Sequence, residues 1–178
     1  PMVKKSLVAL VVVLALVLGY SATRPDSFHV ERTITIAAPP AKVFPLVSDL
    51  KAQQTWSPWE KKDPAMKRTF SASTSGKGAV YSWDGNAEVG AGSLTITEVV
   101  PDSKVVMALA FTRPMQDPSV AELVLTPRGA STEVTWSMHG PMNFVAKVMC
   151  LFMNMDKMVG GDFEKGLAAL KALAETKP

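Results

Sequence analysis

The side chains that could give this protein its chemistry are mainly aromatic rings and methionine thioethers. The chain of 178 residues contains four tryptophans and ten methionines. Methionine is flexible and polarizable, so methionines grouped with rings suit a pocket that accepts apolar molecules of varied shape. For any single residue, ordinary core packing is the alternative, and the prediction of a pocket depends on the whole set. The side chains that we expect to bind a ligand are Trp56, Trp59, Tyr81, Trp83, Asn86, Met107, Phe111, Trp136, Met138, Met155 and Phe163.

An apolar pocket of this kind also needs one or two polar groups that orient its ligand. Enclosing about 300 Å² of apolar ligand surface would contribute roughly 7 kcal/mol. Micromolar binding needs about 8 kcal/mol after the costs of association. The polar candidates are Asn86, Glu88, His139 and Asp156. Three of these also have a structural alternative to ligand binding. Asn86 fits a hairpin turn. His139 could be solvated or hydrogen-bonded to the backbone, and Asp156 could lie on the solvated face of a helix.

Residue spacings argue against metal, triad and nucleotide chemistry. The two histidines, His29 and His139, lie far apart in the chain, and the single cysteine, Cys150, completes no common zinc spacing. No G-x-S-x-G nucleophile motif occurs. The glycines at 76–78 and 90–92 open no predicted helix, as a phosphate loop would, and suit hairpins instead. The sequence therefore predicts no metal and no cofactor, and an acid–base reaction in the pocket stays open.

Charge, cysteine content and length narrow the class of protein further. The formal net charge is +3 at pH 7, and no run of five like charges occurs, so the sequence predicts no nucleic-acid partner. A single cysteine excludes an internal disulfide framework. The length fits one domain, large enough to fold without disulfides or metals, plus a short extra segment. The oligomeric state is left open.

The extra segment is an apolar stretch near the start of the chain. Lys4 and Lys5 precede an apolar run from Leu7 to Tyr20, which is the order of an export signal. With its flanking residues, the run approaches the roughly 20 residues of a membrane-spanning helix. A cleaved signal and an uncleaved anchor are both open, and residues 19–21 favour the anchor because they match a small-x-small cleavage site poorly. The lysines should stay in the cytoplasm, which places the rest of the chain in a periplasmic or other extracytoplasmic space.

We therefore expect a signal or anchor segment at 1–25 and a single domain at 26–178. Within the domain, alternating apolar and polar residues predict strands, and short turns between them predict an antiparallel meander. The expected strands are 28–36, 67–72, 79–83, 93–100, 105–111, 121–125 and 134–138, with a loop at 114–118. Two short helices follow the first strand, one opened by Pro40 and the other at 50–56.

The C-terminal part changes to a repeat of three and four residues. From Val148 to Leu173 this repeat predicts one long amphipathic helix, or two helices with a kink. Gly160-Gly161 is the expected weak point, because paired glycines cost roughly 2 kcal/mol relative to alanine. The fold class is therefore α+β, with a curved antiparallel sheet wrapped around the C-terminal helix.

Six stretches between about Phe28 and Lys171 carry a family resemblance, at 28–32, 38–44, 56–59, 78–83, 155–158 and 162–167. They resemble the START/Bet v 1-like (SRPBCC) superfamily, in particular its polyketide cyclase/dehydrase and lipid-transport branch. The resemblance implies a helix-grip fold with a deep cavity between the sheet and the C-terminal helix. Many proteins of this superfamily bind lipids, sterols, hormones or polyketides, and some are cyclases.

Our principal hypothesis is a membrane-tethered or exported protein that binds a lipid- or polyketide-like small molecule and catalyses no reaction. Its expected partners are that hydrophobic molecule and, through the N-terminal helix, a membrane. The alternative is a cyclase or dehydratase, which requires at least one titratable cavity group with a perturbed pKa. A third hypothesis is a scaffold with a filled core that binds a partner protein through its surface.

Overall fold

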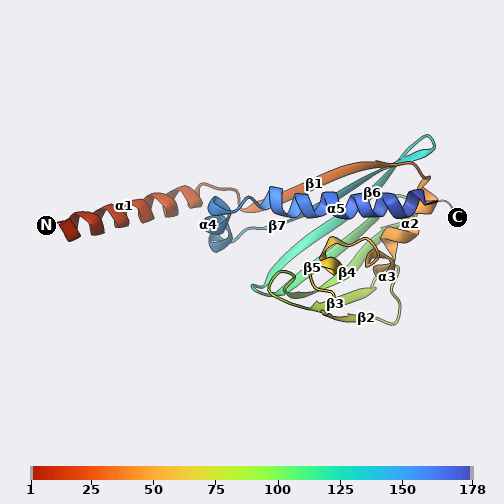
Figure 1. Cartoon of the computed structure of the whole chain (residues 1–178), viewed down its shortest axis with the longest axis horizontal. Coiled ribbons are helices and arrows are strands. Elements are labelled where there is room, and N and C mark those ends of the chain that lie inside the picture. The colour runs from red at the N-terminus through yellow and green to blue at the C-terminus, as the bar shows by residue number, and fades with distance from the viewer. Residues whose placement is uncertain (1, 177–178) are drawn as a thin grey trace.

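A curved antiparallel sheet and a long C-terminal helix form the folded domain, and a separate helix precedes them (Figure 1). This computed structural model describes residues 2–176, so the last two residues of the expected domain lie outside the described residues. The helices are α1 (Met2–Ala22), α2 (Pro40–Ser48), α3 (Leu50–Gln53), the 3-10 helix η1 (Pro58–Lys61), α4 (Phe144–Phe152) and α5 (Met155–Glu175). The strands are β1 (Ser27–Ile36), β2 (Lys67–Phe70), β3 (Val80–Asp84), β4 (Ala91–Val100), β5 (Lys104–Arg113), β6 (Asp117–Arg128) and β7 (Ser131–Pro141).

The seven strands make one antiparallel sheet in the order β1-β7-β6-β5-β4-β3-β2. Strands β2 to β7 form a meander in which each strand pairs with the next, and β1 adds to the free edge of β7. A shift in register between Ile96 and Glu98 of β4 marks a bulge, which bends and twists a strand locally. The predicted meander, and the fold class with its sheet curved around the last helix, are confirmed.

Helix α5 packs on one face of this sheet, chiefly against β1 (Figure 1). On the helix, Phe163 is 1% and Leu170 is 0% exposed. The facing strands keep the alternation expected of a half-buried sheet, with Ala121, Leu123 and Leu125 of β6 all buried. Helix α2 contacts α5, β6 and β7 and closes the end of the sheet at which α5 ends.

The C-terminal helix is divided in two, but the expected position of its weak point is wrong. The interruption lies just before Asn154, between α4 and α5, and α5 runs unbroken through Gly160 and Gly161. Asn154 starts the new helix because its Oδ1 accepts a hydrogen bond from the Lys157 backbone N–H at 2.9 Å. Gly160 serves packing instead, since the guanidinium group of Arg32 occupies the space that a Cβ would need.

Among the elements whose bounds differ from those expected, β2, α3 and β6 show the differences most clearly. Strand β2 ends at Phe70 because the hydroxyl oxygen of Ser71 accepts the Val80 N–H at 2.8 Å, in place of a backbone carbonyl. Helix α3 ends at Gln53, earlier than the expected 50–56. Strand β6 begins at Asp117, inside the expected loop, where it pairs with the end of β5. None of these differences moves a side chain to the other face of the sheet.

Helix α1 extends away from the sheet and is exposed along most of its length (Figure 1). It has 21 residues and is long and apolar enough to cross a membrane, by criteria that a signal sequence near an N-terminus also meets. The helix contacts α4, which lies between α1 and the sheet. The N-terminal segment therefore meets the domain at the α4 end.

Candidate functional site

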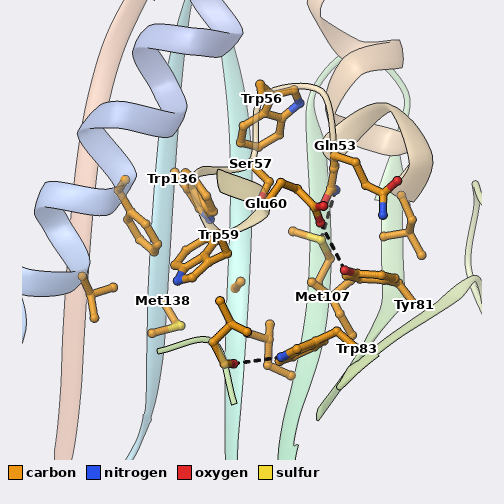
Figure 2. Close-up of a pocket in the computed structure, with 18 of the residues that line it drawn as sticks. Gln53, Trp56, Ser57, Trp59, Glu60, Tyr81, Trp83, Met107, Trp136 and Met138 are labelled. Carbon is orange, nitrogen blue, oxygen red and sulfur yellow. Dashed lines mark hydrogen bonds between the residues drawn. The ribbon is translucent and has the colours of Figure 1, made fainter. Parts of the chain in front are cut away.

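A cavity of about 220 Å³ lies between the inner face of the sheet, helix α5 and the segment from α3 to η1 (Figure 2). Side chains from strands β3 to β7 line one side of it. All four tryptophans of the chain are among the lining residues. The side chains predicted from the sequence that line the cavity are Trp56, Trp59, Tyr81, Trp83, Met107, Phe111, Trp136, Met138 and Phe163. The fold thus gathers widely separated residues around one space.

An aromatic cluster forms the wall below α5. The ring of Trp136 stacks on Phe163 with centroids 4.1 Å apart, and Trp56 and Trp59 meet Trp136 edge to face at 5.3 and 5.6 Å. Such pairs contribute about 0.5–1.5 kcal/mol each beyond the area that they bury. Gly166 permits this packing, because a Cβ there would lie only 2.8 Å from Cζ3 of Trp136. This wall is a closely packed aromatic surface.

A second row of rings crosses β2, β3 and β5 on the opposite wall. Phe70 stacks on Tyr81 at 5.0 Å, Tyr81 stacks on Trp83 at 5.9 Å, and Trp83 meets Phe111 edge to face at 5.6 Å. The Trp83 indole N–H donates to the Val89 carbonyl at 3.0 Å, which fixes the ring (Figure 2). The two walls face each other across the cavity, so an occupant would lie between aromatic surfaces.

Glu60 and Tyr81 form a polar corner in this otherwise apolar lining (Figure 2). The Tyr81 hydroxyl donates to Oε1 of Glu60 at 3.2 Å, and Nε of Arg68 donates to Oε2 at 2.8 Å. Burial, followed by the nearby Glu60 carboxylate, raises the pKa of Tyr81 to about 12. The phenol therefore stays protonated at neutral pH and acts as a hydrogen-bond donor.

Two buried side-chain donors in the lining lack partners among the described residues. They are Nε1 of Trp136 and Nε2 of Gln54. By contrast, the Trp56 indole N–H donates to the Leu46 carbonyl at 2.8 Å. An unpaired buried donor costs about 1–3 kcal/mol. An acceptor atom that reached either donor would recover part of this cost.

Asn86 does not line the cavity. Its Oδ1 accepts the Glu88 N–H at 2.9 Å and the Val89 N–H at 3.3 Å, and its Nδ2 donates to the Lys62 carbonyl at 3.2 Å. These bonds hold the turn between β3 and β4 and leave the side chain outside the cavity. Glu88, the next polar candidate along the chain, does line the cavity from that turn.

Three other candidates also lie elsewhere. Met155 starts α5 beyond the helix interruption and lines a separate hollow beside α4. Asp156 binds Arg32, with Oδ2 2.9 Å from Nη2, and thereby ties the first turn of α5 to β1. His139 is exposed on the outer face of β7, with its ring 6.4 Å from that of His29. The interruption before Asn154 and the pleat of β7 explain these positions.

Sequence reasoning missed four polar lining residues, which are Gln53, Gln54, Ser57 and Glu60. All four lie in the segment from α3 to η1, around the Trp56–Trp59 turn, whose two tryptophans are among the predicted ligand-binding residues. Their neighbours in sequence were the available signal, because a turn that inserts two tryptophans into a core carries adjacent side chains with it. Gln53 shows this directly, since its Nε2 lies 3.3 Å from the sulfur of Met107.

A curved antiparallel sheet that holds a C-terminal helix over a lined cavity defines the helix-grip, Bet v 1-like class of folds. The chain matches the family model described as polyketide cyclase / dehydrase and lipid transport over residues 27–175. The protein therefore belongs to this family, and the resemblance seen in the sequence is confirmed. No curated protein matches the chain significantly.

Several solved structures share the fold at low sequence identity. A protein of Chromobacterium violaceum is 15% identical with a TM-score of 0.60, over 86% of this chain and all of the other. The Aha1 protein of Colwellia psychrerythraea, solved as a dimer, is 18% identical with a TM-score of 0.56, over 85% of this chain and 99% of that one. DynU16, from the dynemicin biosynthetic locus, is 16% identical with a TM-score of 0.59, over 86% of this chain and 48% of its own. These similarities establish the fold alone.

Proposed function

We propose that this protein binds a hydrophobic, lipid- or polyketide-like small molecule in the cavity under α5. The observation that carries the proposal is an unfilled space of about 220 Å³ surrounded by every tryptophan of the chain. A scaffold with a filled core would leave no such space, so the cavity favours binding over the scaffold hypothesis. The proposed ligand-binding side chains are the lining residues named above, and Asn86 and Met155 are not among them.

The size of the cavity limits the ligand. Pockets for drug-sized ligands measure about 300–1,000 Å³, and this cavity is smaller. We infer a small or slender occupant, such as one acyl chain or a compact ring system. A large multi-ring polyketide would require the aromatic walls to move apart.

The unpaired donors indicate one further property of the ligand. Among the described residues, Trp136 and Gln54 each bury an N–H donor without an acceptor, whereas the one O–H of Tyr81 already donates to Glu60. A carbonyl, carboxyl or hydroxyl oxygen on the ligand would satisfy one of them and fix its orientation. The proposed ligand is therefore an apolar body with one or two acceptor oxygens.

We also propose that α1 holds the domain at a membrane, with residues 1–25 as the anchor and 26–178 as the binding domain. At about 1.5 Å per residue, its 21 residues span about 32 Å, and a bilayer core is about 30 Å thick. Lys4 and Lys5 at its start favour a cytoplasmic N-terminus, with the domain on the other side. Hydrophobic molecules concentrate in the same bilayer.

Recovery of the ligand with the protein tests the binding proposal. The full chain is purified from cell membranes in mild detergent, and its bound molecules are identified by native and extract mass spectrometry. Ala121→Phe places a ring in the cavity, because Ala121 lines it and is 4% exposed. Ala110→Phe adds the same volume on the exposed face of β5 and is the matched control.

We expect one recurrent apolar ligand per protein in the wild type and in Ala110→Phe, and none in Ala121→Phe. Equal recovery from the two variants, or preparations that never carry a ligand, would refute the proposal. Thermal unfolding of both variants shows whether each is folded, so loss of ligand is separated from loss of structure.

A cyclase or dehydratase is the second candidate, and the carboxylate of Glu60 in the cavity wall is the observation that favours it. Two features weigh against it. Glu60 is already engaged by Arg68 and Tyr81, and the raised pKa of Tyr81, about 12, lies far from the neutral range of an efficient acid or base. Chemical change of the recovered ligand on incubation with the wild type, and its absence with Glu60→Gln, would establish the enzyme.

A further inference from the structure

Helix α4 presents its apolar side outward. Its large exposed side chains are Phe144, Val145, Met149 and Phe152. With 3.6 residues per turn, these four positions form one stripe along the helix, which we call the outer stripe. Phe152 is 76% exposed. The helix's charged residue, Lys147, lies on the opposite side, where its side chain is 8% exposed and pairs with Asp26.

This arrangement is the reverse of that expected for a surface helix in water. A surface helix buries its apolar stripe and presents its charges to solvent. In α4 the ammonium group is buried and the phenylalanine rings are exposed, so contact of the outer stripe with water is unfavourable and an apolar cover would stabilise it. A helix with this pattern suits a bilayer interface, with its apolar side among the acyl chains.

The position of α4 identifies which environment covers the stripe. Helix α1 contacts α4 (Figure 1). Tyr20 and Arg24, near the end of α1, lie together, with the Arg24 Nη1 3.5 Å from the Tyr20 hydroxyl. Tyrosine is enriched where a helix leaves the bilayer, and an arginine at this level can extend its guanidinium group toward the headgroups and water. Because α4 packs beside this point, it lies at the level of the lipid headgroups once α1 spans the membrane.

We infer that the outer stripe of α4 docks on the surface of the same bilayer that α1 crosses. The inference rests on the proposed tether. It goes further, because it gives the domain a fixed orientation in place of free rotation on an anchor. Docked in this way, the protein meets the membrane at two points, α1 and α4.

The docked orientation also relates the cavity to the bilayer. Helix α4 follows the end of β7, at the end of the sheet where β1 and β6 begin. Val89, Phe111 and Val159 line the cavity and belong to this same end, before β4, near the end of β5 and in the early turns of α5. Docking of α4 therefore turns this end of the cavity toward the lipid from which a hydrophobic ligand would come.

Depth-dependent quenching on the full chain tests the inference. The protein is inserted into vesicles of phosphatidylcholine with some phosphatidylglycerol, at one protein per vesicle and again at higher density. A polarity-sensitive fluorophore is attached to one cysteine at a time, in a Cys150→Ser background. The sites are Phe152→Cys on the outer stripe, Lys77→Cys in the exposed turn at the far end of the sheet, and Leu14→Cys within α1.

Iodide in the water and spin-labelled lipids then report where each label lies. We expect the label at 152 to be quenched by shallow spin labels and several-fold less by iodide than the label at 77. The label at 14 should respond to deep spin labels. If 152 behaves like 77 while 14 stays in lipid, the docking inference fails and the tether stands. If 14 is open to iodide, the tether itself fails. Protection at 152 that disappears at one protein per vesicle means that a second copy covers the stripe, and this also overturns the inference.

Discussion

Helices α4 and α5 follow each other in the chain, yet their apolar sides have opposite surroundings. In α5, Phe163 and Leu170 are buried against the sheet, whereas in α4 the outer stripe is exposed, Phe152 by 76%. Both helices have an amphipathic sequence. A periodic sequence pattern therefore predicts which side of a helix is apolar. The neighbouring elements of the fold determine whether that side is buried. The apolar side of α5 is buried by the sheet, and we infer that a bilayer buries the outer stripe of α4.

Small residues help to explain why α5, and not α4, packs closely against the sheet. Gly166 lets the helix axis approach Trp136, and Gly160 lets Arg32 cross over the first turns. Arg32 then binds both Asp156 and Glu164, with Nε 2.8 Å from Oε1 of Glu164. Helix α4 contains no glycine, and its inward contact is an ion pair with the linker after α1.

The largest expected effect comes from truncating one apolar residue on each helix. Leu170→Ala removes a side chain that is 0% exposed, so the free energy of unfolding should fall by about 2–5 kcal/mol. Phe152→Ala should change it by less than about 0.5 kcal/mol, because the ring packs on little protein. Denaturant unfolding in detergent, followed by tryptophan fluorescence, gives both values. Similar losses would mean that the outer stripe is packed and that the comparison fails.

A methyl group between α5 and the sheet should have the next largest effect. In Gly166→Ala the Cβ would lie 2.8 Å from Trp136 and 3.0 Å from Cδ of Pro58. The helix or the ring must move, which typically costs about 1–3 kcal/mol. Tm measures the loss of stability, and near-UV circular dichroism reports the changed environment of the Trp136 indole. An unchanged near-UV spectrum would show that α5 does not press on the aromatic wall.

Gly161→Ala is the matched test on the free side of the same helix. No atom of residues 2–176 lies within 4 Å of a Cβ at Gly161, so the expected change is in helix propensity, and alanine is favoured over glycine by about 0.8–1.0 kcal/mol. The free energy of unfolding should rise by up to this amount, in the same denaturant experiment. A clear loss of stability would place an unseen contact on this side of α5.

The smallest expected effect is the pH dependence of the α4–α5 junction. Hydrogen bonds from Arg32 lower the pKa of Asp156 below its ordinary 3.8. A carboxyl group with a lowered pKa stabilises the folded state above the ordinary value, and this contribution is lost as pH falls through the lowered pKa. From pH 5 to pH 2, Tm should therefore fall slightly more in the wild type than in Asp156→Asn. If Tm falls by the same amount in both proteins, the Arg32–Asp156 pair does not help to hold α5 on the sheet.

The sequence predicted the sheet well because its strands repeat with a period of two and are separated by clear turns. It also predicted several side chains that meet in the cavity, since Tyr81, Met107 and Phe111 lie on the apolar side of their strands. Helix α5 was recognised from its repeat of three and four residues. These signals come from residues close together in the sequence, so they can be recognised without the tertiary structure.

The remaining features depend on contacts between distant segments. From sequence alone, Gly160-Gly161 predicts a break in the helix. The structure shows that Arg32 of β1 fills the space beside Gly160 instead. Glu60 and Gln54 face the cavity because the Trp56–Trp59 turn is inserted into the core, which no repeat reveals. The exposure of the outer stripe of α4 is seen only once the neighbours of this helix are known, and among helices α4 contacts mainly α1. Such features require the tertiary structure.

Quenching of tryptophan fluorescence by a brominated ligand shows whether an apolar molecule enters the cavity under α5. All four tryptophans line the cavity, so a brominated medium-chain fatty acid inside it must contact indole rings and reduce their emission. In detergent at fixed concentration, we predict saturable quenching at one ligand per protein for the wild type and Ala110→Phe. We predict only the linear background of the detergent for Ala121→Phe. The same saturable quenching in Ala121→Phe, or no saturation in the wild type, would contradict the account.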